Sequence, residues 1–434
     1  MKIIDGKKCR RGVILAITAI VVSAVPASLV RAQSSQGTQA PTYGIPPSAN
    51  TQRALSNAPG VSKNVLSGFY ASLGVALGWT DNALRVPSQL KESDTVVVIL
   101  PALGFKTDVG RHEASIDYSG YGESFQDFDN LSAMDNRLRA AMDFDFTEKL
   151  DAGIFAGYAD VNERRGTSGS PVLQIEPNEV EITDYGATLT YGTDAAKHMR
   201  LRIGADVEDW RYQNNDQEFR DRDTNGAFGE IHYNATAKTS VFLLGTYRDF
   251  EYTQANATTS DSDETTLDSD ETTLQGGVEW RATEKTIGRI SVGTLDKDFK
   301  DPSVPDEDTL TYTARIHWQP QTRTGVNLYG SRRTEETNSA LDNFYLSTLW
   351  GLSVDHSFAD RWSGDVYYNG INDDYDSGRD DKFHDFGIGV HYAFRRWLSL
   401  GARYGYIKRD SNIPINNYEE NYFAFTLQAN YQQY

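Results

Sequence analysis

The sequence predicts an all-β protein: a transmembrane antiparallel β-barrel of the outer-membrane type, with about 18 strands, long extracellular loops and short periplasmic turns. Three observations predict this fold. Apolar and polar residues alternate with a period of two from Gly68 onward, the segments between these runs are alternately long and short, and most tryptophans lie near the ends of the runs. Such alternation gives each strand one apolar and one polar face, as a wall between lipid and a wet lumen requires.

The N-terminal residues have the form of an export signal rather than of folded structure. A basic start that includes Lys2 and Arg10 precedes an apolar run from Gly12 to Ala24, and Val30–Ala32 is a small-x-small cleavage pattern. The next stretch is rich in Gln, Ser, Pro and Asn, a composition typical of disorder. We therefore expect a signal peptide over residues 1–32, a disordered periplasmic tail over residues 33–67 and a transmembrane β-barrel over residues 68–434.

Composition excludes several classes of protein. The formal net charge of −19 argues against nucleic acid as a partner, because phosphate binding needs basic patches. A mean hydropathy of −0.54 and the lack of a long apolar run after the signal exclude a membrane protein built from helices. Aromatic residues make up 12% of the chain and there are 36 glycines, an excess that suits a barrel with one face in lipid. The only cysteine, Cys9, lies in the signal.

Strict alternation marks each expected strand. Around position 202, for example, Leu201 and Ile203 alternate with Arg200 and Arg202. A helical period fits none of these runs. The expected strands lie near residues 69–79, 95–106, 111–122, 134–146, 151–161, 180–191, 198–210, 224–234, 239–252, 272–282, 286–296, 308–318, 323–334, 343–356, 361–371, 382–394, 397–408 and 420–431.

The connections between these runs alternate in length. Long loops on one side and tight turns on the other are the bacterial outer-membrane arrangement, and an even number of strands returns both termini to the periplasm. The long connections lie near residues 80–94, 123–133, 162–179, 211–223, 253–271, 297–307, 335–342, 372–381 and 409–419. Short ones include residues 107–110, 147–150, 283–285, 319–322 and 357–360.

Aromatic residues indicate where the chain meets the membrane surface. Two interfacial girdles would place tryptophans near both ends of the strands. The last strand, Phe423 to Tyr431, alternates aromatic and aliphatic residues in the way that the barrel-assembly machinery recognises. We therefore expect that machinery, outer-membrane lipid and lipopolysaccharide as partners, and the cell outer membrane, after signal-peptide cleavage, as the location. Trp280, Trp318, Trp362 and Trp397 lie next to short turns, Trp79 and Trp210 begin long loops, and Trp350 lies in mid-strand.

No residue pattern indicates catalysis, so we expect a protein that is not an enzyme and has no catalytic, cofactor-binding or metal-binding residues. Seven histidines are scattered singly, without the spacing of metal ligands. One repeat, DSDETTL at residues 261–267 and again at 268–274, concentrates carboxylates in one expected loop. Either it binds divalent cations or it is a solvated run of charge. The lack of a calcium-loop glycine and ligand spacing favours the second interpretation.

The polar face of the strands is the surface with functional content. Its guanidinium groups could pair carboxylates bidentately and so pass sugars or anionic polymers. Alternatively, opposite charges on neighbouring strands neutralise each other and hold the wall together. The candidate lumen-lining residues are Arg137, Arg139, Asp143, Asp145, Arg200, Arg202, Asp206, Glu208, Arg315, Asp365 and Arg403.

Two short stretches carry a family resemblance. Gly78–Arg85 and Thr107–His112 resemble the opening of the putative beta-barrel porin family, which is often linked to exopolysaccharide or capsule export in α-proteobacteria. The specific part is the Asp-Asn…Arg of the first loop and the Gly-Arg-His of the first turn. The resemblance covers residues 68–434 and implies a large outer-membrane barrel and, by association, polysaccharide translocation. It provides no catalytic residues to carry over.

The leading hypothesis is therefore an outer-membrane channel that exports an exopolysaccharide or capsular polysaccharide with a periplasmic export protein as partner. A porin for small hydrophilic solutes is the first alternative. A structural or adhesive barrel that uses its acidic loops is the second.

Overall fold

The fold is built from long strands that each pair with two neighbours. The computed structural model describes residues 68–168, 175–253, 267–283, 285–336 and 342–432, so the predicted signal peptide and periplasmic tail lie outside the described residues. The strands are β1 (Gly68–Thr80), β2 (Asp94–Val109), β3 (His112–Phe125), β4 (Ala133–Thr147), β5 (Leu150–Glu163), β6 (Asn178–Gly192), β7 (Met199–Tyr212), β8 (Arg222–Thr236), β9 (Thr239–Tyr252), β10 (Ser269–Thr283), β11 (Thr286–Phe299), β12 (Glu307–Gln321), β13 (Thr324–Glu336), β14 (Phe344–Ser357), β15 (Trp362–Tyr375), β16 (Asp380–Arg395), β17 (Leu398–Ser411) and β18 (Tyr418–Gln432).

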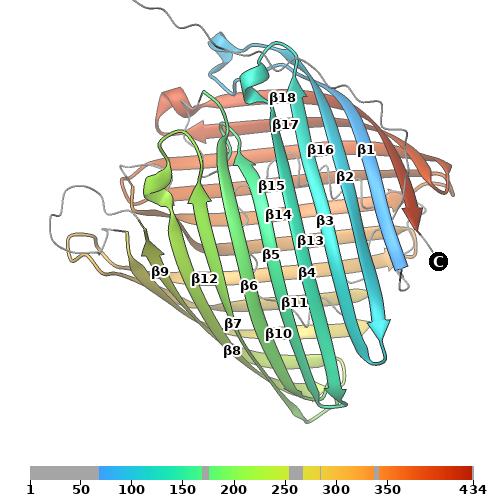
Figure 1. The fold of residues 1–434 in the computed structure, drawn as a ribbon, viewed down its shortest axis with the longest axis vertical. Coiled ribbons are helices and arrows are strands. Elements are labelled where there is room, and N and C mark those ends of the chain that lie inside the picture. The colour runs from blue at the N-terminus through green and yellow to red at the C-terminus, as the bar shows by residue number, and fades with distance from the viewer. Residues whose placement is uncertain (1–67, 169–174, 254–266, 284, 337–341, 433–434) are drawn as a thin grey trace, which may run out of the picture.

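These strands form one closed antiparallel barrel. Each pairs with its neighbours in sequence, and β1 also pairs with β18, from Tyr70 opposite Gln432 to Thr80 opposite Tyr422. Figure 1 shows the closure, where the blue first strand lies beside the red last strand. Closure leaves no strand edge with unpaired amides, as a sheet in lipid requires. The predicted fold class, including the number of strands, is confirmed.

The two ends of the barrel differ in the length of their connections. At one end, the turn end, adjacent strands are joined by tight turns, such as the one at Gly110, whose φ of 69° suits glycine. At the other, the loop end, the connections are long and carry four short 3-10 helices: η1 (Ser88–Leu90), η2 (Asp129–Leu131), η3 (Glu218–Arg220) and η4 (Pro414–Asn416). Among the described residues, no helix is long and apolar enough to cross a membrane.

Most strands extend further toward the loop end than the alternation predicts. For example, β10 begins at Ser269 rather than near residue 272, and β15 continues to Tyr375 rather than ending near residue 371. The apolar face stops where lipid would stop, but the backbone ladder continues into water because neighbouring strands still pair there. The alternation therefore predicts the part of each strand in the membrane and not its full length.

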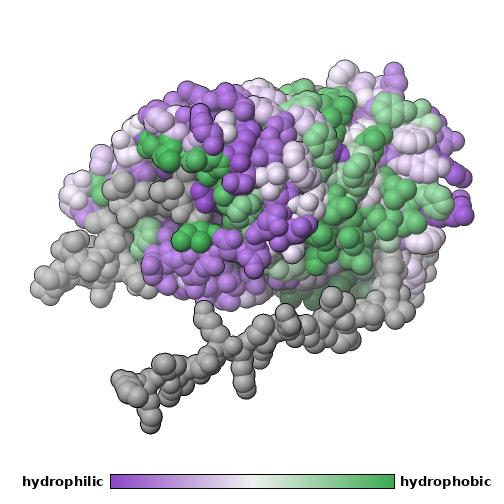
Figure 2. Space-filling view, turned by 90° about the horizontal axis from the view of Figure 1, so that it is seen from above, coloured by the Kyte–Doolittle hydropathy of each residue, from purple (hydrophilic) through white to green (hydrophobic). Residues whose placement is uncertain are grey.

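The outward face carries the apolar residues. Leu77, Leu201, Leu243 and Phe425 are all exposed on it, as expected for side chains that meet lipid. In Figure 2 a hydrophobic band crosses the barrel between two hydrophilic ends. Trp210 is an exception, because it is only 2% exposed and shares the inward parity of its strand. Its placement in a membrane-surface girdle was wrong.

Candidate functional site

The candidate site is the lumen, which every strand lines with alternate side chains. The ladders between strands place all of the predicted lumen residues on the face opposite the exposed apolar residues. They do not share one environment, however. We call the lumen face of β3–β6 the open wall and that of β7–β11 the packed wall.

The open wall carries charged side chains that are accessible within the lumen. Arg137, Arg139, Asp143 and Asp151 are exposed, and Asp145 is half-buried. Asp145 lies directly opposite Asp151 in the ladder between β4 and β5. Like charges directly opposite each other on neighbouring strands are unfavourable, which is tolerable where water can solvate both.

Arg139 is the best-held side chain of the open wall. Its guanidinium lies 4.2 Å from the ring centre of Phe155 and donates from Nη1 to Asp184 Oδ2 at 2.9 Å. The ring of Phe155 in turn covers Gly186, where a Cβ would lie 2.8 Å from it. The glycine therefore allows the ring to lie flat on the wall and to support the guanidinium.

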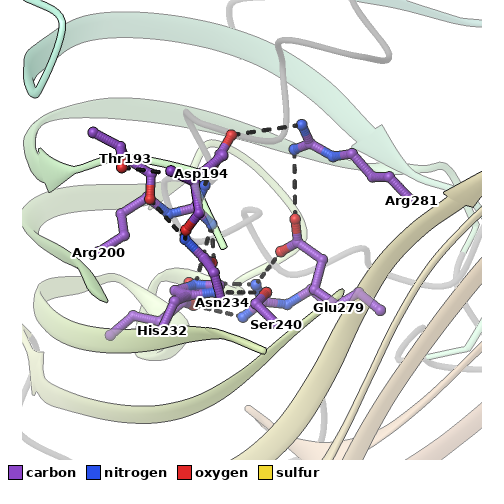
Figure 3. Close-up of polar contacts among 11 residues, drawn as sticks. Thr193, Asp194, Arg200, His232, Asn234, Ser240, Glu279 and Arg281 are labelled. Atoms are coloured by element: carbon purple, nitrogen blue, oxygen red, sulfur yellow. Dashed lines mark hydrogen bonds and ion pairs between the residues drawn. The ribbon is translucent and has the colours of Figure 1, made fainter. Parts of the chain in front are cut away.

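The packed wall has the opposite character, because its lumen-facing charges are buried or half-buried. Glu230 is at its centre: Arg289 Nη2 donates to its Oε2 at 2.5 Å, and His232 Nε2 contacts its Oε1. Arg289 also donates from Nη1 to Glu279 Oε2 at 3.2 Å. Figure 3 shows the network continuing toward the turn end through Arg200 to Asp194 and through Glu279 to Arg281.

Arg202 makes no ion pair in this network of described residues. It lies opposite Glu230 in the ladder, but the Glu230 oxygens are engaged by His232 and Arg289. Within the part of the chain that the structure describes, its Nε and Nη2 have no acceptor, and its guanidinium stacks 4.9 Å from the ring centre of Phe228. The remaining predicted charges on β7, Asp206 and Glu208, both lie near Arg248 Nη2, at 3.5 and 3.7 Å.

A second buried network lies on β15–β17. Asp365 accepts from Arg403 Nη2 at 2.7 Å and contacts His391 Nε2 at 2.8 Å. Arg403 also stacks 5.5 Å from the ring centre of Tyr367. Arg315, the last predicted residue, is half-buried and lies opposite Arg289. On β15–β17 and over most of the packed wall, opposite charges therefore contact each other. This is the arrangement expected if the charges of the wall neutralise each other.

A segment from the loop end crosses the lumen. We call residues 164–168, which follow β5, the crossing segment. Ser168 Oγ donates to Asp373 Oδ2 of β15 at 2.5 Å, and Tyr418 OH of β18 donates to the Gly166 carbonyl oxygen at 2.7 Å. By the shorter way round the barrel, seven strands separate β5 from β15 and four separate β5 from β18, so the Ser168 contact joins nearly opposite walls.

The start of the crossing segment is fixed to its own side of the barrel. Arg164 is buried, contacts Glu123 and donates from Nη1 to Asp135 Oδ2 at 3.0 Å, while its guanidinium lies 4.7 Å from the ring centre of Tyr121. Burial alone would lower the pKa of Arg164, but Glu123 and Asp135 outweigh it and raise the pKa above its usual range. The guanidinium is therefore a permanent cation at this anchor.

The first loop, between β1 and β2, also contacts the crossing segment. Arg85 donates from Nε to Glu420 Oε2 at 2.8 Å and from Nη1 to the Arg165 carbonyl oxygen at 3.1 Å. Its φ of 48° is unusual for a residue other than glycine, and such backbone persists only where surrounding contacts fix it. Asn82 is fully buried and bonds both the amide and the carbonyl of Val86. The Asp-Asn…Arg motif of the first loop therefore builds the joint between the first strand, the last strand and the crossing segment.

Buried ion pairs pack much of the rest of the loop end. Each is tied by a contact of 2.7 Å, and each cation lies against an aromatic ring. They are Arg220 with Glu163 against Tyr212, Lys297 with Glu336 against Phe250, and Arg409 with Asp381 against Phe383. Together with the crossing segment, these pairs narrow the lumen at this end.

Comparison with known proteins identifies the family. The sequence model of the family described as Putative beta-barrel porin 2 matches residues 69–431. The chain belongs to this family. A search of curated proteins found no match. The family resemblance is thereby confirmed, and the protein is an outer-membrane β-barrel porin.

A comparison with solved structures returned porins at low similarity to this family member. They include OpdK of Pseudomonas aeruginosa, solved with vanillate (10% identity, TM-score 0.45, covering 85% of this chain and 100% of that chain). OccK2 of the same organism, solved in complex with glucuronate, is 14% identical with a TM-score of 0.45, covering 85% and 99%. A BenF-like porin from Pseudomonas fluorescens Pf-5 is 12% identical with a TM-score of 0.44, covering 85% and 100%. These matches say nothing about what passes through this barrel.

One contact in this porin resembles a catalytic triad. His232 Nδ1 lies 3.3 Å from Ser240 Oγ, and its Nε2 contacts Glu230. Arg200 Nη2 lies within 3.5 Å of both ring nitrogens, however, and Ser240 is only 8% exposed. A serine nucleophile needs an accessible hydroxyl and a base free to take its proton, so these contacts suit packing better than catalysis. That the protein is not an enzyme stays a prediction.

The acidic repeat lies only partly within the described residues, which begin again at Leu267. Asp268 Oδ1 accepts the Tyr252 amide at 2.8 Å, Asp270 accepts from Tyr247 OH at 2.6 Å, and Glu271 accepts from Thr334. In the described part of the chain, no group of three or more His, Cys, Asp or Glu residues could hold a metal ion. The second copy of the repeat begins β10 instead of lying wholly in a loop. Whether the first copy binds divalent cations stays untested.

Sequence reasoning missed the crossing segment. Its residues lie in a predicted long loop, and the glycine and serine there are typical of loops anywhere. One signal was present: the first-loop motif that carries the family resemblance includes Arg85, a cation within an otherwise uncharged stretch from Asn82 to Pro87. A positive charge so placed indicates a fixed carboxylate partner but does not say which one.

Proposed function

We propose that the barrel is a passive channel for small hydrophilic solutes, narrowed at the loop end by the crossing segment. The observation that carries the proposal is the set of contacts made by that segment, which is held by Arg164 at its start and by Tyr418 of β18, and which reaches Asp373 on the nearly opposite wall. A polymer could pass only if these buried contacts were broken during transport. Small solutes need only the space beside the open wall.

Polysaccharide export stays the competing hypothesis, since the family resemblance carries that association. It requires the crossing segment to be displaced, and its periplasmic partner would act near residues 33–67, which lie outside the described residues. No contact in the described barrel favours the structural or adhesive alternative over either channel.

The test is solute passage through the full mature chain in lipid. In planar bilayers we expect ohmic single-channel conductance, and in liposome swelling we expect uptake of monosaccharides to exceed that of trisaccharides, with dextran excluded. Tyr418→Phe removes the hydroxyl that holds Gly166, so it should widen the pore and raise the size limit. The matched control is Tyr404→Phe, which removes a hydroxyl on the outward face that bonds Asn421 at 2.8 Å, and it should change neither readout.

A barrel that shows no conductance, or one that passes a long polysaccharide as readily as a monosaccharide, would contradict the proposal. Unchanged size limits in a folded Tyr418→Phe variant would show that the crossing segment does not control the path.

A further inference from the structure

Two arginines of the open wall differ from most other arginines of the lumen. Arg137 and Arg139 alternate on β4, so both point inward, and both are exposed. In contrast, Arg202, Arg403 and Arg409 are buried on other strands. Exposure within the lumen means that a passing solute can contact the first two and not the others.

Arg137 makes no direct ion pair within the described residues, although Asp135 and Asp184 lie near enough to attract it. Its neighbours in the two ladders are Ser119 of β3 and Ala159 of β5, neither of which carries a charge. Asp135, the next carboxylate on its strand, is engaged by Arg164 and Asn162. Among the described residues, no hydrogen bond or ion pair is made by the Arg137 side chain.

Arg139 makes one hydrogen-bonded ion pair, with Asp184, lies opposite Asp117 in the ladder, and still has donors free. Phe155 fixes the plane of its guanidinium, and Asp184 takes only a contact from Nη1, while 49% of the side chain is exposed. A guanidinium has five N–H donors, so several remain for an acceptor in the lumen. Its fork is held in place before any solute arrives, which lowers the entropy cost of binding.

We propose that Arg137 and Arg139 together bind the anionic group of a passing solute, a carboxylate, phosphate or sulfate. This inference rests on the proposed function and names its substrate class. The two residues lie about 7 Å apart along the strand, because alternate residues are spaced at twice the rise of about 3.3 Å. Two guanidinium groups at that spacing can both contact one oxyanion or the two ends of a small acid.

The position of the pair gives it control over selectivity. Asp135, two residues before Arg137, contacts Arg164 of the crossing segment, so the pair lies directly below the narrowed region. Three carboxylates lie near that level: Asp135 pairs with Arg164, Asp184 pairs with Arg139, and Asp117 lies directly opposite Arg139 in the ladder between β3 and β4. Asp143, Asp145 and Asp151 lie further toward the turn end. Charge acts most strongly where the path is narrow and water is scarce, so the arginines set the preference.

The test is the reversal potential of the full mature chain in planar bilayers under a salt gradient, with potassium chloride, potassium acetate and potassium phosphate in turn. The wild-type protein should favour the anion over potassium. The variant with Arg137→Gln and Arg139→Gln should lose that preference by about threefold or more, because removal of a charge from a narrow path changes ion partitioning by this order. The double lysine variant should keep chloride preference but bind phosphate less well, since Lys lacks the planar fork.

The matched control is Arg323→Gln. This arginine lies in the turn between β12 and β13 and pairs with Asp360 at 2.8 Å, and its loss should leave the permeability ratio unchanged. Heat-dependent migration in gels would check that each variant is folded. An absence of conductance in the wild type would contradict the proposed function itself. An open pore that favours potassium, or a ratio that the double glutamine variant leaves unchanged, would overturn only the present inference.

Discussion

The open wall and the packed wall have similar sequences and different interiors. Both alternate apolar residues with charges, and both place arginine over a phenylalanine ring that covers a glycine. On the open wall the arginine Arg139 remains half exposed, whereas on the packed wall Arg202 is 7% exposed. The difference arises from the neighbours of each wall, because β8 to β11 supply Glu230, Arg289 and other large polar side chains that fill their side of the lumen.

This difference teaches which charges hold the barrel together and which are available to a solute. A buried charge must be paired, and removal of its partner is costly. An exposed charge is stabilised by water and contributes little to stability. The packed wall should therefore respond to mutation mainly through stability and the open wall mainly through transport.

The largest expected effect is the loss of Glu230. In Glu230→Gln the half-buried Arg289 guanidinium keeps only Glu279 as a charged partner and the buried His232 loses the carboxylate that it contacts, so unfolding free energy should fall by about 3 kcal/mol. The matched change on the open wall, Asp184→Asn, should cost less than about 1 kcal/mol, because its partner Arg139 is exposed. Urea unfolding of the barrels in lipid vesicles would measure both. Equal losses would show that the two walls do not differ in kind.

Two glycines offer a second comparison. A Cβ at Gly204 would lie 2.4 Å from the Phe228 ring and 2.9 Å from the backbone oxygen of Ala187, so Gly204→Ala should cost about 2 kcal/mol. At Gly153 of the open wall the nearest atoms are the ends of Thr188 and Asp143, at 3.0 and 3.1 Å. These side chains can move, so Gly153→Ala should be neutral or stabilising by less than about 1 kcal/mol.

Thermal midpoints of the two alanine variants, read from the heat-dependent shift in gel migration, would measure this second difference. A tolerated Gly204→Ala would mean that the Phe228 ring is free to move, and the packed wall would then be less tightly packed than its contacts indicate.

The smallest expected effect concerns the rings below the arginines. Phe155→Leu should cost about 0.5 kcal/mol, because a partly exposed cation–π contact contributes only about 0.5–1 kcal/mol. Phe242→Leu should cost more than about 1 kcal/mol, since the ring lies 3.8 Å from Arg289 and is 5% exposed. Both unfolding free energies can be measured as for Glu230→Gln. A larger loss of unfolding free energy in Phe155→Leu would indicate that the packing of this ring also stabilises the open wall.

The period-two pattern was sufficient to predict the closed barrel and the inward side of each strand. The alternation predicts that Arg139 and Arg202 both point into the lumen. Nothing in the pattern says that Arg139 is exposed and Arg202 is buried. Exposure depends on side chains from other strands, such as Glu230 and Arg289, and these are brought together only by the closed sheet. Trp210 shows a different error. It alternates in step with Arg202 and should have been predicted to point inward, but it was placed at the membrane surface because tryptophans are common there.

The crossing segment was beyond sequence reasoning for a related reason. Its anchors Asp373 and Tyr418 lie more than 200 residues away in the chain, and local composition does not encode such a pairing. The candidate lumen residues predicted from alternation include Arg137 and Arg139. Their position below the narrowed region became apparent only from the contact between Asp135 and Arg164.

The joint formed by Arg85, Glu420 and Tyr418 has a consequence for the order of assembly. Its residues come from the loop after the first strand and from the last strand. Its hydrogen bonds therefore cannot form until β18 has paired with β1. Before that pairing forms, the crossing segment lacks its contacts to Arg85 and Tyr418, and only those to strands such as β4 and β15 can hold it. The full set of contacts that holds the crossing segment is therefore complete only in the closed barrel.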